Sequence, residues 1–116
     1  MKKARNLKVG DVVQFPEYEF APHRTGWNGW LFRAAIIEKL YVSTKGIKCA
    51  TIRYCTATAS KDQPLPNKET TKNIKCDYLF EYNVDFERNR YNDWKSKHGV
   101  GFCNEDIALL LNHNII

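Results

Sequence analysis

Long apolar runs are missing from this sequence, and their absence excludes several classes of protein. No stretch of the 116 residues is apolar over the length of about 20 positions that a membrane-spanning helix needs. The basic start, MKKARN, is not followed by an apolar segment, so we expect no export signal. These absences predict a protein without a membrane partner, in a cytoplasmic setting.

Cysteine and histidine are few and widely spaced. No Cys-x-x-Cys pair occurs, although structural zinc sites are usually built from such close pairs. We therefore expect reduced thiols and no bound metal or cofactor. The spacing leaves two alternatives open. Cys76, His98 and Cys103 could converge as metal ligands, and Cys103 and His98 could form a nucleophile pair. The four cysteines are Cys49, Cys55, Cys76 and Cys103.

Motifs for catalysis are missing as well. The six glycines form no phosphate-binding loop. Asp85 and Glu87 fall where the first turn of a helix is expected, and acids there stabilise the helix dipole. We expect a non-catalytic protein, with no catalytic residues.

Negative charge is scarce in the first half of the chain. Residues 1–57 hold ten Lys and Arg against four Asp and Glu, whereas residues 58–116 hold eight against nine. The formal net charge is +5 and the pI is about 9.1. A positive field attracts phosphate backbones or acidic protein surfaces.

Strand patterns dominate the chain up to residue 82. Val12, Val13 and Phe15 favour a strand, and Pro16 is expected to end it because proline has no N–H to donate. Residues 16–29 then read as an aromatic loop. The polar residues 58–73 contain two prolines and predict a long surface loop, and residues 74–83 are strand-like again.

A hairpin is predicted over residues 30–57, where apolar side chains alternate. A turn at Thr44-Lys45-Gly46 would join the two strands with Ser43 opposite Ile47. In this register Leu40 lies opposite Ala50, Glu38 opposite Ile52 and Ile36 opposite Tyr54. The predicted core face therefore carries Trp30, Phe32, Ala34, Ile36, Leu40, Ala50, Ile52 and Tyr54.

Helix signals are confined to the end of the chain. Asn83 is a capping residue before the first helix, and Gly99 is a stop signal after it. Asn104 is expected to cap a second helix. The sequence thus predicts an α+β fold, with a small, strongly bent antiparallel sheet or partly open β-barrel and one or two C-terminal helices. We expect a basic flexible arm at 1–8 and one globular domain at 9–116, with a barrel-like sheet over about 9–82 and a helical part over about 84–113.

The opposite face of the hairpin would gather Arg33, Lys39 and Arg53 toward water. Lys45 and Lys48 extend this surface at the tip, and Tyr41 could stack on a base. Cations on one side of a rigid element suit a phosphate backbone. We therefore predict binding of DNA or RNA, mainly through phosphates, helped by the basic arm. The expected residues are Arg33, Lys39, Tyr41, Lys45, Lys48 and Arg53. The alternative is a solvated face whose cationic stems cover apolar sheet surface.

Three stretches of the first half follow the order of a known barrel family. They contain Val9, Gly10, Asp11 and Val13, then Phe32, Arg33, Ala34 and Ile36, then Ile52 and Tyr54. This order resembles the opening of Tudor-like small barrels of the Src-homology-3 type, over residues 7–55. The resemblance implies a small β-barrel. It also implies that aromatic residues near the first loop can form a cage for a methylated lysine or arginine.

The aromatic loop supports an alternative function. Tyr18, Trp27 and Trp30 could read a peptide, with Glu17 and Glu19 as acidic neighbours. The two tryptophans could equally plug one end of a barrel. Within this alternative the protein is a protein–protein interaction module, or an accessory subunit that docks on an acidic partner.

Overall fold

The structure is a computed structural model that describes residues 1–21, 27–57, 67–101 and 104–116. The side chains of residues 19–21, 27, 28, 57 and 67 lie outside this description. The elements, in chain order, are β1 (Val12–Ala21), β2 (Trp27–Val42), β3 (Lys48–Ala57), β4 (Asn67–Lys75), a 3-10 turn η1 (Cys76–Tyr78), β5 (Phe80–Glu81), α2 (Val84–His98) and α3 (Glu105–Asn112).

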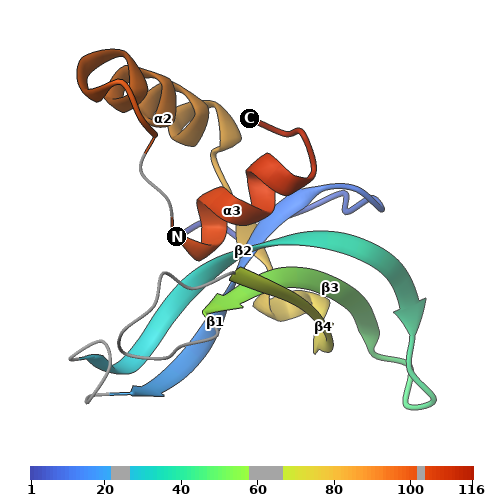
Figure 1. The fold of residues 1–116 in the computed structure, drawn as a ribbon. Coiled ribbons are helices and arrows are strands. Elements are labelled where there is room, and N and C mark those ends of the chain that lie inside the picture. The colour runs from blue at the N-terminus through green and yellow to red at the C-terminus, as the bar shows by residue number, and fades with distance from the viewer. Residues whose placement is uncertain (22–26, 58–66, 102–103) are drawn as a thin grey trace.

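The described strands form one antiparallel sheet of five strands in the order β4-β3-β2-β1-β5. Figure 1 shows that the sheet is strongly bent, that the long β2 curves through it, and that α3 lies over one side with α2 farther out. The sheet is open, with β4 and β5 at its edges. The predicted α+β class with a small, bent antiparallel sheet and late helices is confirmed.

Two irregularities bend the middle of the sheet. Before β1, Gly10 has a φ of 94° and donates its N–H to the carbonyl of Ile37 at 2.8 Å, while Ile37 donates to the carbonyl of Asp11 at 3.0 Å. In β2 the pairing with β3 shifts by one residue between Ile37 and Lys39, so Glu38 is an extra residue. Such bulges bend a strand and increase its twist.

The bulge at Glu38 decides which face of β2 is buried. Leu40 still pairs with Ala50 as predicted, but beyond the bulge Ile37 pairs with Ile52. The predicted core face of β2 is therefore wrong for Trp30 and Phe32, which lie before the bulge, because an inserted residue exchanges the two faces of a strand. Ala34 of the same predicted face is buried, in a second cluster. Trp30 and Phe32 are 65% and 40% exposed. The buried core consists of Val13, Phe15, Ala35, Ile37, Ala50, Ile52, Tyr54 and Leu79.

Helix α3 covers the other face of the sheet. Ala108 and Leu109 pack against Ala34 and Cys55. The carboxylate of Asp106 accepts a hydrogen bond from the backbone N–H of Ala34 at 3.0 Å. The β2–β3 pairs end at Ile36 and Arg53, so the Asp106 side chain supplies a partner for β2 beyond the end of the ladder. Burial raises the pKa of Asp106, and the hydrogen bond from Ala34 opposes that rise.

Two segments predicted as loops are partly strand. Pro16 does not end β1, which pairs it with Phe32 and continues to Ala21. Ile37 donates its N–H to Asp11 and accepts from Gly10 through its C=O, so it is a hydrogen-bonded position of β2 toward the β1 side. Hydrogen-bonded and non-hydrogen-bonded pairs alternate along an antiparallel ladder, which makes Phe32 and Pro16 a non-hydrogen-bonded pair. The nitrogen of Pro16 therefore faces the open edge, where a missing N–H removes no ladder bond. Residues 67–73 belong to β4, while residues 22–26 and 58–66 of the predicted loops lie outside the described part of the chain.

The short-range signals were predicted correctly. Ser43 donates to the carbonyl of Ile47 at 2.8 Å, and Gly46 has a φ of 77°. The side chain of Asn83 caps α2 by accepting from Phe86, and the side chain of Asn104 caps α3. No helix among the described residues has the length and apolar character of a membrane span.

The basic arm runs beside η1 and β5. Lys3 forms an isolated bridge with Phe80, and Ala4 donates to the carbonyl of Leu79 at 3.0 Å. Leu7 packs against the buried core. The arm is thereby placed close to the β2–β3 hairpin, while its predicted flexibility stays a prediction.

Candidate nucleic-acid interface

The three cations that were predicted to share one face do not all share it. Arg33 pairs with Phe15 across β1 and β2, and so lies on the core side of the sheet. Its Nε donates to Glu17 at 2.5 Å, and its side chain is only 12% exposed. Arg53, which lies between Ile52 and Tyr54 of the core, points to the opposite side. Lys39 pairs with Thr51 and so lies on the same side of the sheet as Arg53. The prediction of a common face therefore holds for Lys39 and Arg53 and is wrong for Arg33, because the bulge at Glu38 breaks the regular register.

Arg53 is also engaged with carboxylates. Its guanidinium donates to Glu38 and lies 4.0 Å from a carboxylate oxygen of Glu69. Glu69 in turn contacts the ring of His113 at 2.6 Å, just after α3. This cluster ties β3 and β4 to the C-terminal end of α3. The structure therefore gives Arg33 and Arg53 roles within the fold, rather than placing them as free cations on an exposed surface.

The Glu69 cluster predicts a pH dependence of stability. The hydrogen bond with His113, followed by the charges of His113 and Arg53, lowers the pKa of Glu69 below its ordinary value of 4.5. A carboxylate with a lowered pKa stabilises the fold above its unfolded pKa, and this stability is lost as the pH falls through the lowered value. We expect the free energy of unfolding to fall below about pH 4.5 and Glu69→Gln to remove part of that fall, measured by urea unfolding across pH.

Asp106 changes the pH dependence of stability in the opposite direction, since its raised pKa favours the protonated form in the folded state. Comparison of Glu69→Gln with the unchanged protein holds the Asp106 contribution constant. An identical pH profile for the two proteins would show that Glu69 does not contribute as expected.

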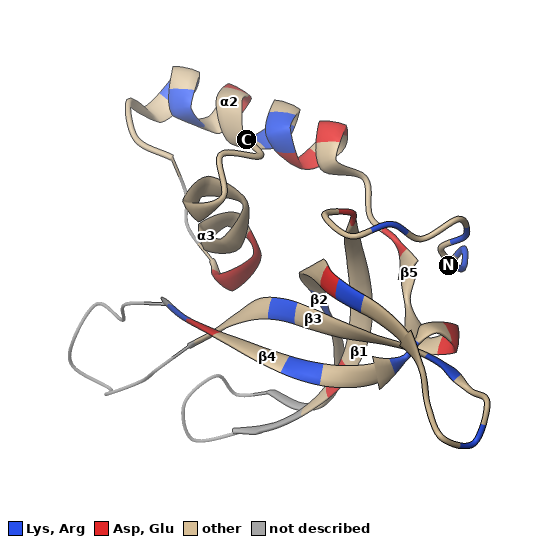
Figure 2. Ribbon diagram, turned by 90° about the vertical axis from the view of Figure 1, so that its right-hand side faces the viewer, with Lys and Arg blue, Asp and Glu red and all other residues tan. Residues whose placement is uncertain are grey.

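The remaining cations differ in their ion pairing, and among the described residues Lys68, Lys72 and Lys75 of β4 and Lys95 of α2 have no ion pair. On α2, Arg88, Arg90 and Lys97 each pair with a carboxylate one turn away. In the arm and the hairpin, by contrast, six cations have no ion pair with any carboxylate of the described residues. They are Lys3, Arg5, Lys8, Lys39, Lys45 and Lys48. Figure 2 shows the N-terminal arm and the β2–β3 hairpin at the same end of the molecule, with Lys and Arg on both.

A groove of about 760 Å³ lies between the arm and the hairpin. We call it the arm–hairpin groove; it is lined by residues 3–7, 40–42, 47–49 and 76–77. Its cations are Lys3, Arg5 and Lys48, and its one acidic lining residue among those described is Asp77. Two of the predicted interface residues, Tyr41 and Lys48, line this groove together. The apolar lining of Leu40, Val42 and Ile47 was not predicted, although the alternation of apolar residues beside the turn could have suggested it.

Tyr41 and Cys76 also line the groove. Lys39 lies over the Tyr41 ring, with its Nζ 5.6 Å from the ring centroid. Burial, followed by the neighbouring Cys49, raises the pKa of the Tyr41 hydroxyl. Burial also raises the pKa of the Cys76 thiol. Both groups are therefore uncharged near neutral pH, and the balance of charge in the groove is positive.

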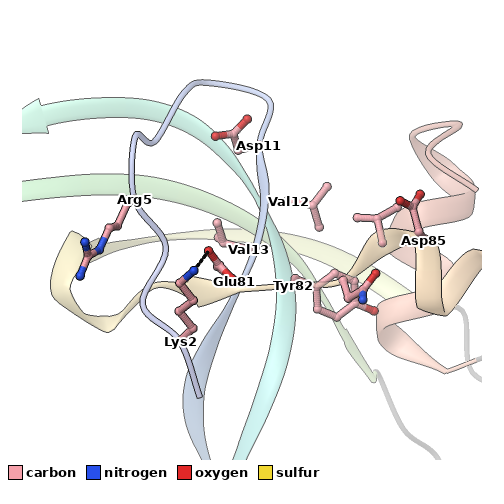
Figure 3. Close-up of a pocket in the computed structure, with 10 residues that line it drawn as sticks. Lys2, Arg5, Asp11, Val12, Val13, Glu81, Tyr82 and Asp85 are labelled. Carbon is pink, nitrogen blue, oxygen red and sulfur yellow. Dashed lines mark ion pairs between the residues drawn. The ribbon is translucent and has the colours of Figure 1, made fainter.

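A second hollow, of about 680 Å³, has a different charge balance (Figure 3). Lys2 is paired there with Glu81, with 3.8 Å between the Nζ and a carboxylate oxygen. Asp11 and Asp85 also line this hollow, and Arg5 lines both hollows. Three carboxylates against two cations make this hollow a poor site for a polyanion.

The alternative aromatic residues are partly brought together. The rings of Tyr18 and Trp30 meet edge to face with centroids 5.6 Å apart, and Phe32 meets Phe80 in the same way at 5.7 Å. Tyr18 is 50% exposed. The side chain of Trp27 lies outside the described residues. Together with Trp30 and Phe32, Tyr18 makes an exposed aromatic face at the far end of β1 and β2.

The predicted Cys–His convergence is only partly described. His98 stands at the end of α2, where its ring lies 4.2 Å from that of Trp94. Cys76 is in η1, and Cys103 lies outside the described residues. Within the described ranges, no group of three or more His, Cys, Asp or Glu side chains could hold a metal ion.

Comparison with models of protein families, with curated proteins and with solved structures found no match. The Tudor-like resemblance therefore stays a prediction, and the site is interpreted from its own residues.

Proposed function

We propose that this protein is a non-catalytic module that binds nucleic acid in the arm–hairpin groove. The observation that supports the proposal is that cations without an ion pair to a described carboxylate gather around one groove. Lys3, Arg5 and Lys48 line the groove without an ion pair to a described carboxylate, and Lys45 lies in the adjoining turn. Unpaired cations gathered on two neighbouring segments attract a phosphate backbone, because each contact releases condensed counterions.

The proposed contacts differ from those expected from the sequence. Lys45, Lys48 and Tyr41 remain in the interface, Lys39 lies beside Tyr41, and the arm adds Lys3 and Arg5. Arg33 and Arg53 take no part, since both are engaged with glutamates. Contacts of this kind supply affinity with little base readout. We propose a cytoplasmic setting, in keeping with the free thiols of Cys49 and Cys76.

The salt dependence of binding tests this function. Binding to DNA and RNA oligonucleotides of one sequence would be followed by fluorescence anisotropy from about 50 to 200 mM salt. Four phosphate contacts, from Lys3, Arg5, Lys45 and Lys48, predict that affinity falls roughly 50- to 150-fold over this range. Failure to bind either nucleic acid at low salt contradicts the proposal, and so does an affinity that does not change with salt concentration.

The second candidate is a protein–protein module, with a Tudor-like peptide reader as its most specific form. The observation that favours it is the 65% exposure of Trp30, because exposed tryptophans are enriched at the centres of interfaces. Trp30→Ala is expected to change nucleic-acid affinity by less than about twofold, since Trp30 lies outside the groove. If a folded Trp30→Ala variant lost nucleic-acid binding, the result would show that the interface lies on the aromatic face.

A further inference from the structure

The lining of the arm–hairpin groove includes three large apolar side chains, which phosphate contacts alone do not require. Leu40, Val42 and Ile47 all line the groove. They remain 37%, 64% and 36% exposed. Large apolar side chains that face water beside a ring of cations indicate a ligand with both apolar and anionic parts.

The strand register places the two kinds of side chain side by side. Val42 pairs with Lys48, and Leu40 pairs with Ala50, on neighbouring strands. Directly opposite residues of an antiparallel pair have their Cβ atoms about 5 Å apart on one face. A phosphate held by Lys48 would therefore bring its own nucleoside against Val42.

From this arrangement we infer that the groove binds an unpaired, single-stranded segment of nucleic acid in preference to a duplex. The inference rests on the proposed function and specifies its ligand. An unpaired base exposes two flat, largely apolar faces that can cover Leu40, Val42 and Ile47. A duplex stacks those faces inside itself and presents its phosphates and sugars outward, so these three apolar side chains would stay in contact with water.

The size of the groove agrees with this ligand. Its volume of about 760 Å³ lies within the range of pockets that enclose small molecules. It therefore has room for about one or two unpaired nucleotides. The remaining phosphates of a strand would follow the cations outside the groove, on the hairpin turn and the arm.

Electrostatics alone favours the opposite order of affinities. Each neutralised phosphate contributes more to salt-dependent binding on duplex DNA than on a single strand, because the duplex has the higher charge density. Tighter binding of a single strand would therefore report a contribution from the bases and not from the phosphates.

The test compares a single-stranded DNA of about 12 nucleotides with the blunt duplex of the same sequence. At about 100 mM salt we expect the single strand to bind at least about tenfold more tightly. The double variant Leu40→Ser with Val42→Ser is expected to lose about tenfold in affinity for the single strand, with its salt slope and its affinity for the duplex unchanged.

A matched control uses two exposed valines outside the groove. Val9 and Val100 are 63% and 67% exposed, so Val9→Ser with Val100→Ser removes similar apolar surface without touching the groove. This control is expected to bind like the unchanged protein. Thermal unfolding checks that both variants are folded, and Val42→Ser alone, with a loss of about threefold, replaces the double variant if Leu40→Ser unfolds the protein.

Each outcome decides one of the two proposals. Duplex affinity equal to or above that of the single strand overturns the inference and leaves nucleic-acid binding in place. Equal losses for both ligands in the double variant also overturn it. Absence of binding to both DNA ligands and to RNA of the same sequence overturns the proposed function, and the inference with it.

Discussion

Replacing Lys45 and Lys48 by glutamate is expected to weaken nucleic-acid binding by about 100-fold at 100 mM salt. At this salt concentration, loss of two phosphate contacts removes roughly 25-fold in affinity, and the two introduced carboxylates repel the backbone further. The salt slope should become shallower by about 1.5. Both lysines are exposed and unpaired among the described residues, so the fold should be unchanged. Fluorescence anisotropy across salt measures affinity and slope together.

A matched charge reversal on α2 separates position from net charge. Lys95 and Lys97 are also exposed, and Lys95→Glu with Lys97→Glu alters the net charge by the same amount. Because α2 does not line the groove, this variant should lose less than about fivefold in affinity. Equal losses in the two variants would show that binding follows total charge and has no defined site.

The substitution Ile37→Ala is expected to cost about 2 to 5 kcal/mol of stability. Ile37 is 1% exposed and belongs to the main core cluster, so truncation leaves a cavity that the bent sheet closes only in part. Domains of this size have total stabilities of about 5 to 15 kcal/mol. The variant should therefore unfold at much lower urea concentration, with the slope of the transition unchanged.

Phe32→Ala is the control for this prediction on the same strand. It removes a larger side chain, but Phe32 is 40% exposed and lies on the other face of β2. We expect a loss below about 1 kcal/mol. A larger loss from Phe32→Ala than from Ile37→Ala would support the regular hairpin register and contradict the bulge at Glu38.

Features that depend on neighbouring residues were predictable. The turn at Thr44–Gly46 needs a residue with positive φ, and Gly46 supplies it. Asn83 and Asn104 are capping residues because their side chains reach the first N–H groups of the helices that follow. These interactions span three or four residues, so the sequence shows both partners at once.

The burial of β2 could not be predicted in the same way. Ala34, Ala35 and Ile37 are all nearly inaccessible to solvent, because the sheet packs on both of its faces around this point. Alternation then no longer distinguishes an inner from an outer face. The bulge at Glu38 directly follows Ile37, which bonds to Gly10 and Asp11, two residues that are distant in sequence.

The candidate site was predicted in composition but not in arrangement. The excess of cations in the first half is visible in the sequence, whereas their pairing depends on long-range contacts. Glu17 reaches Arg33 across β1 and β2, and Glu69 reaches Arg53 from β4. A count of charges does not show which cations are already engaged.

The position of the interface can be measured directly by adding a single-stranded DNA of about 12 nucleotides to isotopically labelled protein and recording the backbone amide shifts. The groove predicts that the largest changes fall at Lys3, Arg5, Lys48 and residues 40–42, while Trp30 and α2 stay unchanged. Shifts centred on Tyr18 and Trp30, or no shifts at a DNA concentration that saturates binding, would contradict the arm–hairpin groove as the binding site.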